Sequence, residues 1–217
     1  MKIRVIFAEF LGTAILAMAI VGSGIMATNL TKDVGLQLFI VAFTTFLILA
    51  VLIAMLGSIS GAHFNPAVTL MAVINKSISI TSAVYYLLAQ VAGGFIGVVI
   101  ANVMFELPAI GASTHSKTGS NLLLSEVVAT AGLILVISLM SKESAGRYLP
   151  LAVAGWIGSA YFFTSSTTFA NPAVTFARAF SDSFAGIEIN SVAGFVIAQF
   201  IGAVIGIAIA RGLKATH

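Results

Sequence analysis

Residues 61–69 read Gly-Ala-His-Phe-Asn-Pro-Ala-Val-Thr, and residues 170–175 read Ala-Asn-Pro-Ala-Val-Thr, so the core of the first stretch recurs in the second. Asn is preferred at the N-cap of a helix, and Pro is favoured at the first helical position. Asn65 and Asn171 therefore each predict a helix start. The apolar segment after each Asn has about ten residues, and a helix of that size is about 15 Å long, half the hydrocarbon thickness of a bilayer.

The composition predicts a surface that mostly faces lipid. The chain of 217 residues is 59% hydrophobic and 8% charged, with a mean hydropathy of +1.12, whereas a soluble domain has roughly 25% charged residues. The net charge of +3 comes without a basic run, which argues against nucleic-acid binding. There is no Cys, and we find no catalytic constellation, so the sequence predicts no enzyme, no metal and no cofactor.

Six stretches are suited to be spanning helices, which need about 20 mostly apolar residues. They are 5–27, 36–56, 81–104, 121–140, 149–164 and 191–212. The fifth is the shortest, and its extension toward Asn171 stays open. The segments after the two Asn residues are too short to span and are expected to be half-helices. The predicted fold is an all-α membrane protein with six transmembrane helices and two re-entrant half-helices.

Lys and Arg residues are unevenly distributed between the two ends of these spans. With a cytoplasmic N-terminus, seven of the ten fall on the cytoplasmic side, as the positive-inside rule expects. These seven are Lys2, Arg4, Lys76, Lys142, Arg147, Arg211 and Lys214, and the others are Lys32, Lys117 and Arg178. We therefore predict a multi-pass protein of the inner (plasma) membrane with both termini in the cytoplasm.

Polar markers recur in the same order in the two halves of the chain. They are Glu9, Asn65 and Gln90 in the first half and Glu126, Asn171 and Gln199 in the second. Each half contains three spans, and because three is odd, the second half must be inverted in the membrane relative to the first. We interpret residues 1–217 as a single transmembrane domain with half-repeats at about 1–106 and 120–217.

Residues 61–69 resemble the first signature of the major intrinsic protein, or aquaporin, family, and residues 171–173 resemble the second. The resemblance covers essentially the whole chain. It implies six tilted helices, two re-entrant half-helices, one pore per subunit and a homotetramer in the lipid bilayer. The pore motifs would consist of Asn65, Pro66, Ala67, Asn171, Pro172 and Ala173.

The two predicted half-helices would meet N-terminus to N-terminus near the midplane. Each Asn side-chain oxygen would accept from its own first turn, which leaves the NH₂ group as a free donor. The helix dipoles add positive potential at the same place. Such a site favours a solute oxygen and opposes a cation, and aquaporins are the established example of exclusion by half-helix dipoles.

The filter of this chain departs from that of the family's water-selective members, in which an Arg follows the second motif. Val174 occupies that position here, Thr45 lies at the usual aromatic position, and Thr168 lies where a backbone carbonyl lines the filter. At the fifth-span position, usually His, one way of counting gives Ser159 and another gives Tyr161. Without the Arg, the filter is predicted to be wider, uncharged and less polar.

Two residues near the motifs have two interpretations each. Arg178 returns to the helix face of Val174 one turn later. It either places a cation at the outer mouth or anchors the helix to lipid headgroups while paired with Asp182. His63 either lines the cytoplasmic half of the pore, as its counterpart does in the family, or packs in the interior.

Glu9 and Glu126 are ionisable residues inside apolar spans, where such groups are functional candidates. They either couple proton movement in a secondary transporter or accept hydrogen bonds from loop backbone that has no water at that depth. Their symmetric placement favours the structural role, which we extend to Gln90 and Gln199.

Close helix contact with the half-helices is predicted at two small-xxx-small pairs, Gly93 with Gly97 and Gly202 with Gly206.

Taken together, the sequence predicts a passive channel for water and small uncharged solutes. Glycerol and urea have a suitable size. Neutral arsenite is a further candidate, because some similar bacterial proteins with Val in the filter occur in arsenic-resistance settings. The alternative is a secondary transporter with an inverted repeat that uses Glu9 and Glu126 for proton coupling.

Overall fold

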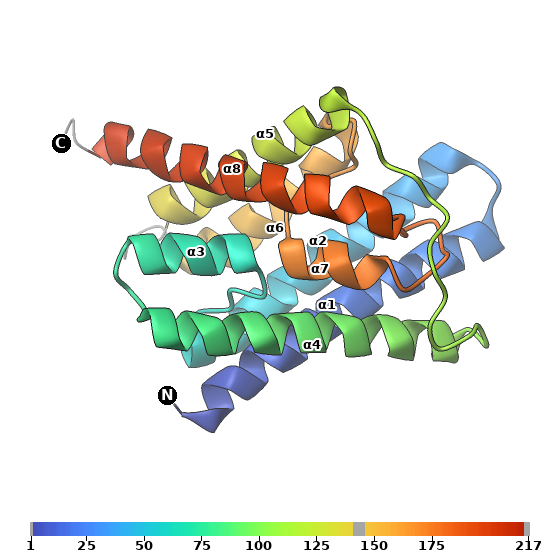
Figure 1. The fold of residues 1–217 in the computed structure, drawn as a ribbon, viewed down its shortest axis with the longest axis horizontal. Helices are drawn as coiled ribbons and strands as arrows, with labels where there is room; N and C mark the ends of the chain where they lie inside the picture. The colour runs from blue at the N-terminus through green and yellow to red at the C-terminus, as the bar shows by residue number, and fades with distance from the viewer. Residues whose placement is uncertain (1, 141–145, 215–217) are drawn as a thin grey trace.

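The computed structural model describes residues 2–140 and 146–214, and this part of the chain is helical, without strands. Its elements are α1 (Ile3–Leu30), α2 (Val34–Ser60), α3 (Pro66–Ile74), α4 (Ile80–Met104), α5 (Ser120–Met140), the 3₁₀ turn η1 (Gly146–Tyr148), α6 (Leu149–Phe163), α7 (Pro172–Arg178) and α8 (Ile189–Lys214) (Figure 1). The predicted all-α fold with six long helices and two short ones is confirmed. Lys142 lies outside the described residues.

Five of the described helices, α1, α2, α4, α5 and α8, are long and apolar enough to cross a membrane. The sixth, α6, has 15 residues and is the shortest of the six, as expected. Its extension toward Asn171 does not occur, because the backbone becomes extended at Thr164 and takes a positive φ at Thr167 and Thr168.

The two short helices lie in the middle of the bundle. Figure 1 shows α3 and α7 extending from the centre toward opposite ends, while the N- and C-termini lie at the same end. Asn65 caps α3 through a hydrogen bond from the Ala67 amide, and Asn171 caps α7 in the same way. The inversion that was inferred from three spans per half is therefore visible in the directions of the half-helices.

Glycines bring the first and third long helices of each half into close contact. A Cβ atom at Gly93 or Gly97 of α4 would lie 2.2 or 2.0 Å from backbone carbonyl oxygens of α1. The same relation holds between α8 and α5, where a Cβ at Gly202 or Gly206 would lie 2.5 Å from a carbonyl oxygen. The prediction that these glycines contact the half-helices was wrong, since their partners are α1 and α5.

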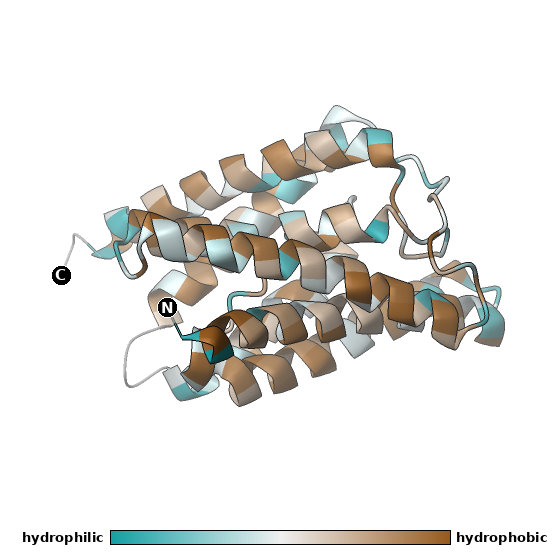
Figure 2. Cartoon of the chain, turned by 60° about the horizontal axis from the view of Figure 1, so that its bottom comes forward, coloured by the Kyte–Doolittle hydropathy of each residue, from teal (hydrophilic) through white to brown (hydrophobic). Residues whose placement is uncertain are grey.

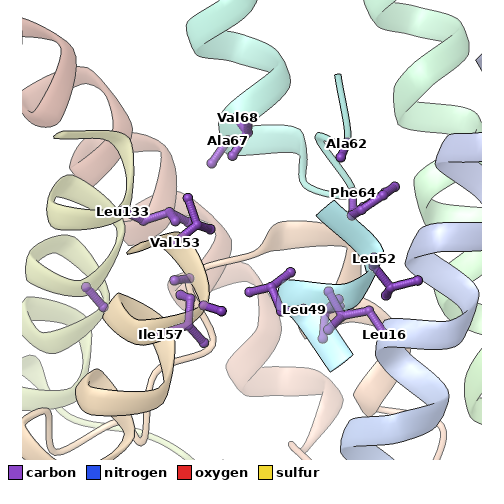
Figure 3. Packing of buried hydrophobic residues seen from close by; sticks show 14 of the residues in the cluster. Leu16, Leu49, Leu52, Ala62, Phe64, Ala67, Val68, Leu133, Val153 and Ile157 are labelled. Carbon is purple, nitrogen blue, oxygen red and sulfur yellow. The ribbon is translucent and has the colours of Figure 1, made fainter. Parts of the chain in front are cut away.

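Apolar side chains lie both in the interior and on the outer surface of the bundle. Figure 2 shows hydrophobic residues along the helices and hydrophilic ones mainly at their ends. Large apolar side chains such as Val51 and Leu151 are exposed by 56% and 57%, as lipid-facing positions would be. Inside, Figure 3 shows buried residues of α1, α2, α3, α5 and α6 that form one cluster with Ala62 and Phe64 of the loop before α3.

Candidate functional site

The loop that precedes α3 is held in place by the carboxylate of Glu9 on α1. One oxygen accepts from the His63 amide at 3.0 Å and from the Ser60 hydroxyl at 2.6 Å. The other accepts from the Phe64 amide at 2.7 Å and from Gln90 Nε2 at 2.8 Å. Glu9 is fully buried, so its carboxylate oxygens take the place of the water that the donors of the loop cannot reach.

The loop that precedes α7 repeats this arrangement. Glu126 on α5 is also fully buried and accepts from the Phe169 amide at 2.9 Å and the Ala170 amide at 2.8 Å. Gln199 Nε2 donates to the same carboxylate at 2.7 Å and to the Thr175 hydroxyl at 2.8 Å. The hydrogen bonds that the structural interpretation of the two Glu and two Gln residues requires are therefore present.

The two loops share an unusual backbone. Ala62 and Phe64 in the first, and Thr168 and Ala170 in the second, have φ between +46° and +50°, which L-residues rarely adopt. Because the amides of each loop point toward a Glu, the carbonyls of the same trans peptide planes point away from it. These loops can therefore present backbone acceptors to the space between the halves.

Asn65 and Asn171 cross-link the two loops. Asn65 Nδ2 donates to the Ala170 carbonyl, and Asn171 Nδ2 donates to the Phe64 carbonyl, both at 2.8 Å. Each side-chain oxygen accepts from its own first turn, as predicted. We expected the NH₂ groups to stay free, and this was wrong for the N–H of each amide that donates to the opposite loop. The second N–H of each amide is the one available to a solute.

A cavity of about 240 Å³ lies beside the cross-linked loops and touches both Asn65 and Asn171. Pro66, Ala67, Pro172 and Ala173 are buried in the first turns of the half-helices and are not part of its wall. The long helices contribute mainly apolar side chains to the wall, namely Leu16, Ile20, Leu49, Ile53, Leu133, Ile137, Val153 and Ile157.

Four of the five predicted filter residues line this cavity. Thr45, Tyr161, Thr168 and Val174 all line it, and the hydroxyls of Thr45 and Tyr161 are 3.2 Å apart. Ser159 is exposed and donates to a carbonyl of its own helix. Of the two alternatives on α6, the structure thus places Tyr161 at the cavity and Ser159 on another face of the helix.

Arg178 lies in the interior, not at the surface. It is 3% exposed, its guanidinium carbon lies 3.5 Å from the centroid of the Phe169 ring, and its Nε donates to the Ala185 carbonyl. The predicted pair with Asp182 was wrong, because Asp182 accepts from the amide and hydroxyl of Thr114, each at 2.9 Å. The hydrogen bond from the Thr114 backbone is the main cause that lowers the pKa of Asp182.

His63 both lines the cavity and packs against other residues. Its ring lines the cavity, its Nδ1 lies 3.1 Å from the Thr69 hydroxyl, and its edge contacts the Tyr86 ring at 5.0 Å between centroids. It is both packed and next to the space between the halves.

A second cavity, of about 350 Å³, was missed by the sequence analysis. We call it the vestibule, and its polar wall consists of His115, Lys117, Tyr161, Thr167 and Arg178. Burial lowers the pKa of Lys117 to about 8, and the nearby charge of Arg178 adds to the effect.

The vestibule forms because the loop of residues 105–119 folds back over the end of α7. The amides of Gly111 and Ser113 donate to the carbonyls of Phe180 and Ala179 at 3.1 and 3.0 Å. No short motif signals such long-range backbone pairing, so the sequence analysis did not predict the vestibule.

Comparison with known proteins agrees with this geometry. The pattern of the family described as Major intrinsic protein matches residues 1–170. Aquaglyceroporin AqpS of Rhizobium meliloti (strain 1021) is 45% identical over 206 residues, which is 95% of this chain and 88% of that protein. Aquaporin-4 of Mus musculus is 30% identical over 186 residues, which is 81% of this chain and 58% of that protein.

The fold has a counterpart among solved structures. The X-ray structure of the aquaglyceroporin from Plasmodium falciparum superposes with a TM-score of 0.73, covering 99% of this chain and 97% of that chain. Because the two sequences are 18% identical, this likeness concerns the fold alone.

Proposed function

The chain belongs to the major intrinsic protein family, whose members are membrane channels and not enzymes, and we propose that it conducts small uncharged solutes through the cavity between its half-helices. The solutes are water, glycerol- or urea-like molecules and neutral arsenite. The observation that carries the proposal is the single cavity that touches Asn65, Asn171 and the uncharged Val174. The name of the relative Aquaglyceroporin AqpS supports a solute larger than water.

The chemistry of the cavity favours neutral solutes with hydroxyl or amide groups. Donors come from the second N–H of each motif Asn, and acceptors come from the carbonyls of the two loops. The positive ends of α3 and α7 oppose a cation that has lost its water shell. The apolar side chains opposite these groups offer no site at which an ion would be stabilised.

The proposed filter consists of Thr45, Tyr161, Thr168 and Val174. Val174 carries neither the charge nor the five donors of an Arg, so the filter is wide and uncharged. Arg178 is proposed to place its cation one turn farther out, where it lines both the cavity and the vestibule.

The membrane setting follows from the same reasoning. The chain is a multi-pass membrane protein, and we place both termini in the cytoplasm because most Lys and Arg residues are at that end of the predicted spans. Exposed apolar helix faces are available for lipid and for the subunit contacts of a homotetramer.

The test is solute flux into proteoliposomes by stopped-flow light scattering, with water, glycerol, urea and neutral arsenite compared. Wild-type protein should conduct at least one of the larger solutes. Val174→Arg should lower that flux about tenfold, which corresponds to about 1.4 kcal/mol at the barrier, and should lower water flux less. Val174→Leu is the matched control for size without charge and should reduce flux only slightly. A wild-type protein closed to every larger solute contradicts the wide filter.

A further inference from the structure

The vestibule adjoins the cavity that we propose for transport. Tyr161 and Arg178 line both spaces, so the two adjoin at these side chains. An anion that binds Arg178 in the vestibule therefore lies next to the cavity.

Cationic donors in the vestibule have no partner of their own. Within the part of the chain that the structure describes, the side chain of Arg178 has one hydrogen-bond acceptor, to which its Nε donates. Both Nη groups have no acceptor, although the side chain is only 3% exposed. The Nζ of Lys117 lies 5.5 Å from the centroid of the Phe169 ring, on which Arg178 also packs, and it has no hydrogen-bond acceptor within the described part of the chain. Arg178 is buried and Lys117 is half-buried, and both line the vestibule, so an anion held there would supply the acceptors that these cations lack.

We propose that the vestibule is a binding site for a small monovalent oxyanion, held by the guanidinium of Arg178 and the ammonium of Lys117. A guanidinium offers paired N–H groups that match two oxygens of a planar anion, and an ammonium adds a point charge. A bound anion obstructs the entrance and slows the flow of neutral solutes.

Other charged groups near the vestibule leave these donors accessible. The carboxylate of Glu126 is fully buried, and its oxygens accept from two backbone amides and Gln199. Asp182 faces Thr114 and lies 3.9 Å from His115 Nε2. No carboxylate among the described residues forms an ion pair with Lys117 or Arg178.

The site should weaken in alkaline solution. Burial and the nearby Arg178 lower the pKa of Lys117 to about 8, so Lys117 is charged at pH 7 and mostly neutral at pH 9. Loss of one ion pair of about 1 kcal/mol corresponds to about fivefold weaker binding. His115 and Tyr161 also line the vestibule, so a His115→Gln variant serves to separate titration of His115 from that of Lys117.

Binding is measured without transport, on the full chain in detergent, from the broadening of the ³⁵Cl NMR line by chloride exchange and its reversal by nitrate. Wild type should broaden the line at pH 7, and nitrate should reverse the effect. Lys117→Gln should weaken nitrate binding about fivefold and abolish the change between pH 7 and pH 9. His115→Gln should retain that change, and Lys32→Gln, which alters an exposed lysine between α1 and α2, should behave as wild type. Equal broadening by wild type and Lys117→Gln overturns the site.

The consequence for transport rests on the proposed function and is tested separately. Nitrate on both sides of proteoliposomes should slow neutral-solute flux through wild type, relative to gluconate at equal ionic strength, and should slow it less in Lys117→Gln. Flux that nitrate leaves unchanged overturns the obstruction. If wild type conducts no neutral solute, the proposed function fails, while the NMR measurement still decides whether the anion site exists.

Discussion

At the scale of single residues, the arrangement depends on buried groups that complete the hydrogen bonds of the re-entrant loops. Glu9 and Glu126 each accept from two consecutive backbone amides at membrane depth. A carboxylate is suited to this task because it only accepts and has about four lone-pair sites. Both residues are fully buried, so these donors take the place of water around each carboxylate.

Glu126→Gln should destabilise the folded chain strongly. The amide group turns one acceptor into a donor that faces the amide of Phe169 or Ala170, and a lost hydrogen bond to a charged group costs about 1.5–3 kcal/mol. Equilibrium unfolding in mixed detergent measures the difference. Glu106→Gln, at an exposed position in the loop after α4, is the control and should change stability by less than about 0.5 kcal/mol.

The same variant separates the two roles considered for these residues. Solute flux is measured with and without a proton gradient in wild type and in Glu126→Gln. If the variant is as stable as wild type, and if the gradient drives flux in wild type but not in the variant, then Glu126 couples protons and the structural role is contradicted.

At the scale of elements, the fold consists of two equivalent helix pairs, α1 with α4 and α5 with α8. Gly97 contacts the Ala14 carbonyl and Gly206 contacts the Ala131 carbonyl. Close packing is a main driving force for helix association in a membrane, because lipid provides no hydrophobic driving force between helices.

Gly97→Ala should therefore separate α4 from α1. Its added Cβ would lie 2.0 Å from the Ala14 carbonyl oxygen, and overpacking of this kind typically costs about 1–3 kcal/mol. The matched control is Gly155→Ala in α6, where nothing lies within 4 Å of the new atom. Unfolding in mixed detergent should show Gly97→Ala destabilised and Gly155→Ala unchanged or slightly stabilised, and equal stability of the two variants counts against the packing.

The sequence predicted the elements well where the signal is local. The Asn-Pro pairs located both half-helix starts, because capping involves only the next few residues. The prediction failed for contacts between residues that are far apart in the sequence. The glycine spacing predicted close approach but not the helix approached, and nothing local indicated that Asn65 donates to the Ala170 carbonyl.

At the scale of the whole molecule, the inverted repeat explains how two halves form one site. Each half provides a Glu that orders its own loop, and each Asn then donates to the loop of the other half. Counting spans predicted the inversion. It did not predict the vestibule, because the position of Lys117 depends on the loop of residues 105–119 folding back over the end of α7.

The central claim is that both halves line a single passage, and the absence of Cys from the chain allows a direct test of it. Val68→Cys in α3 and Val174→Cys in α7 each place one thiol in the cavity wall, and Val51→Cys places one on a 56% exposed face of α2. Neutral-solute flux into proteoliposomes is measured before and after treatment with a small thiol-reactive methanethiosulfonate. We expect block at both cavity positions and none at Val51→Cys, whereas unimpeded flux through labelled Val68→Cys or Val174→Cys would contradict a shared passage.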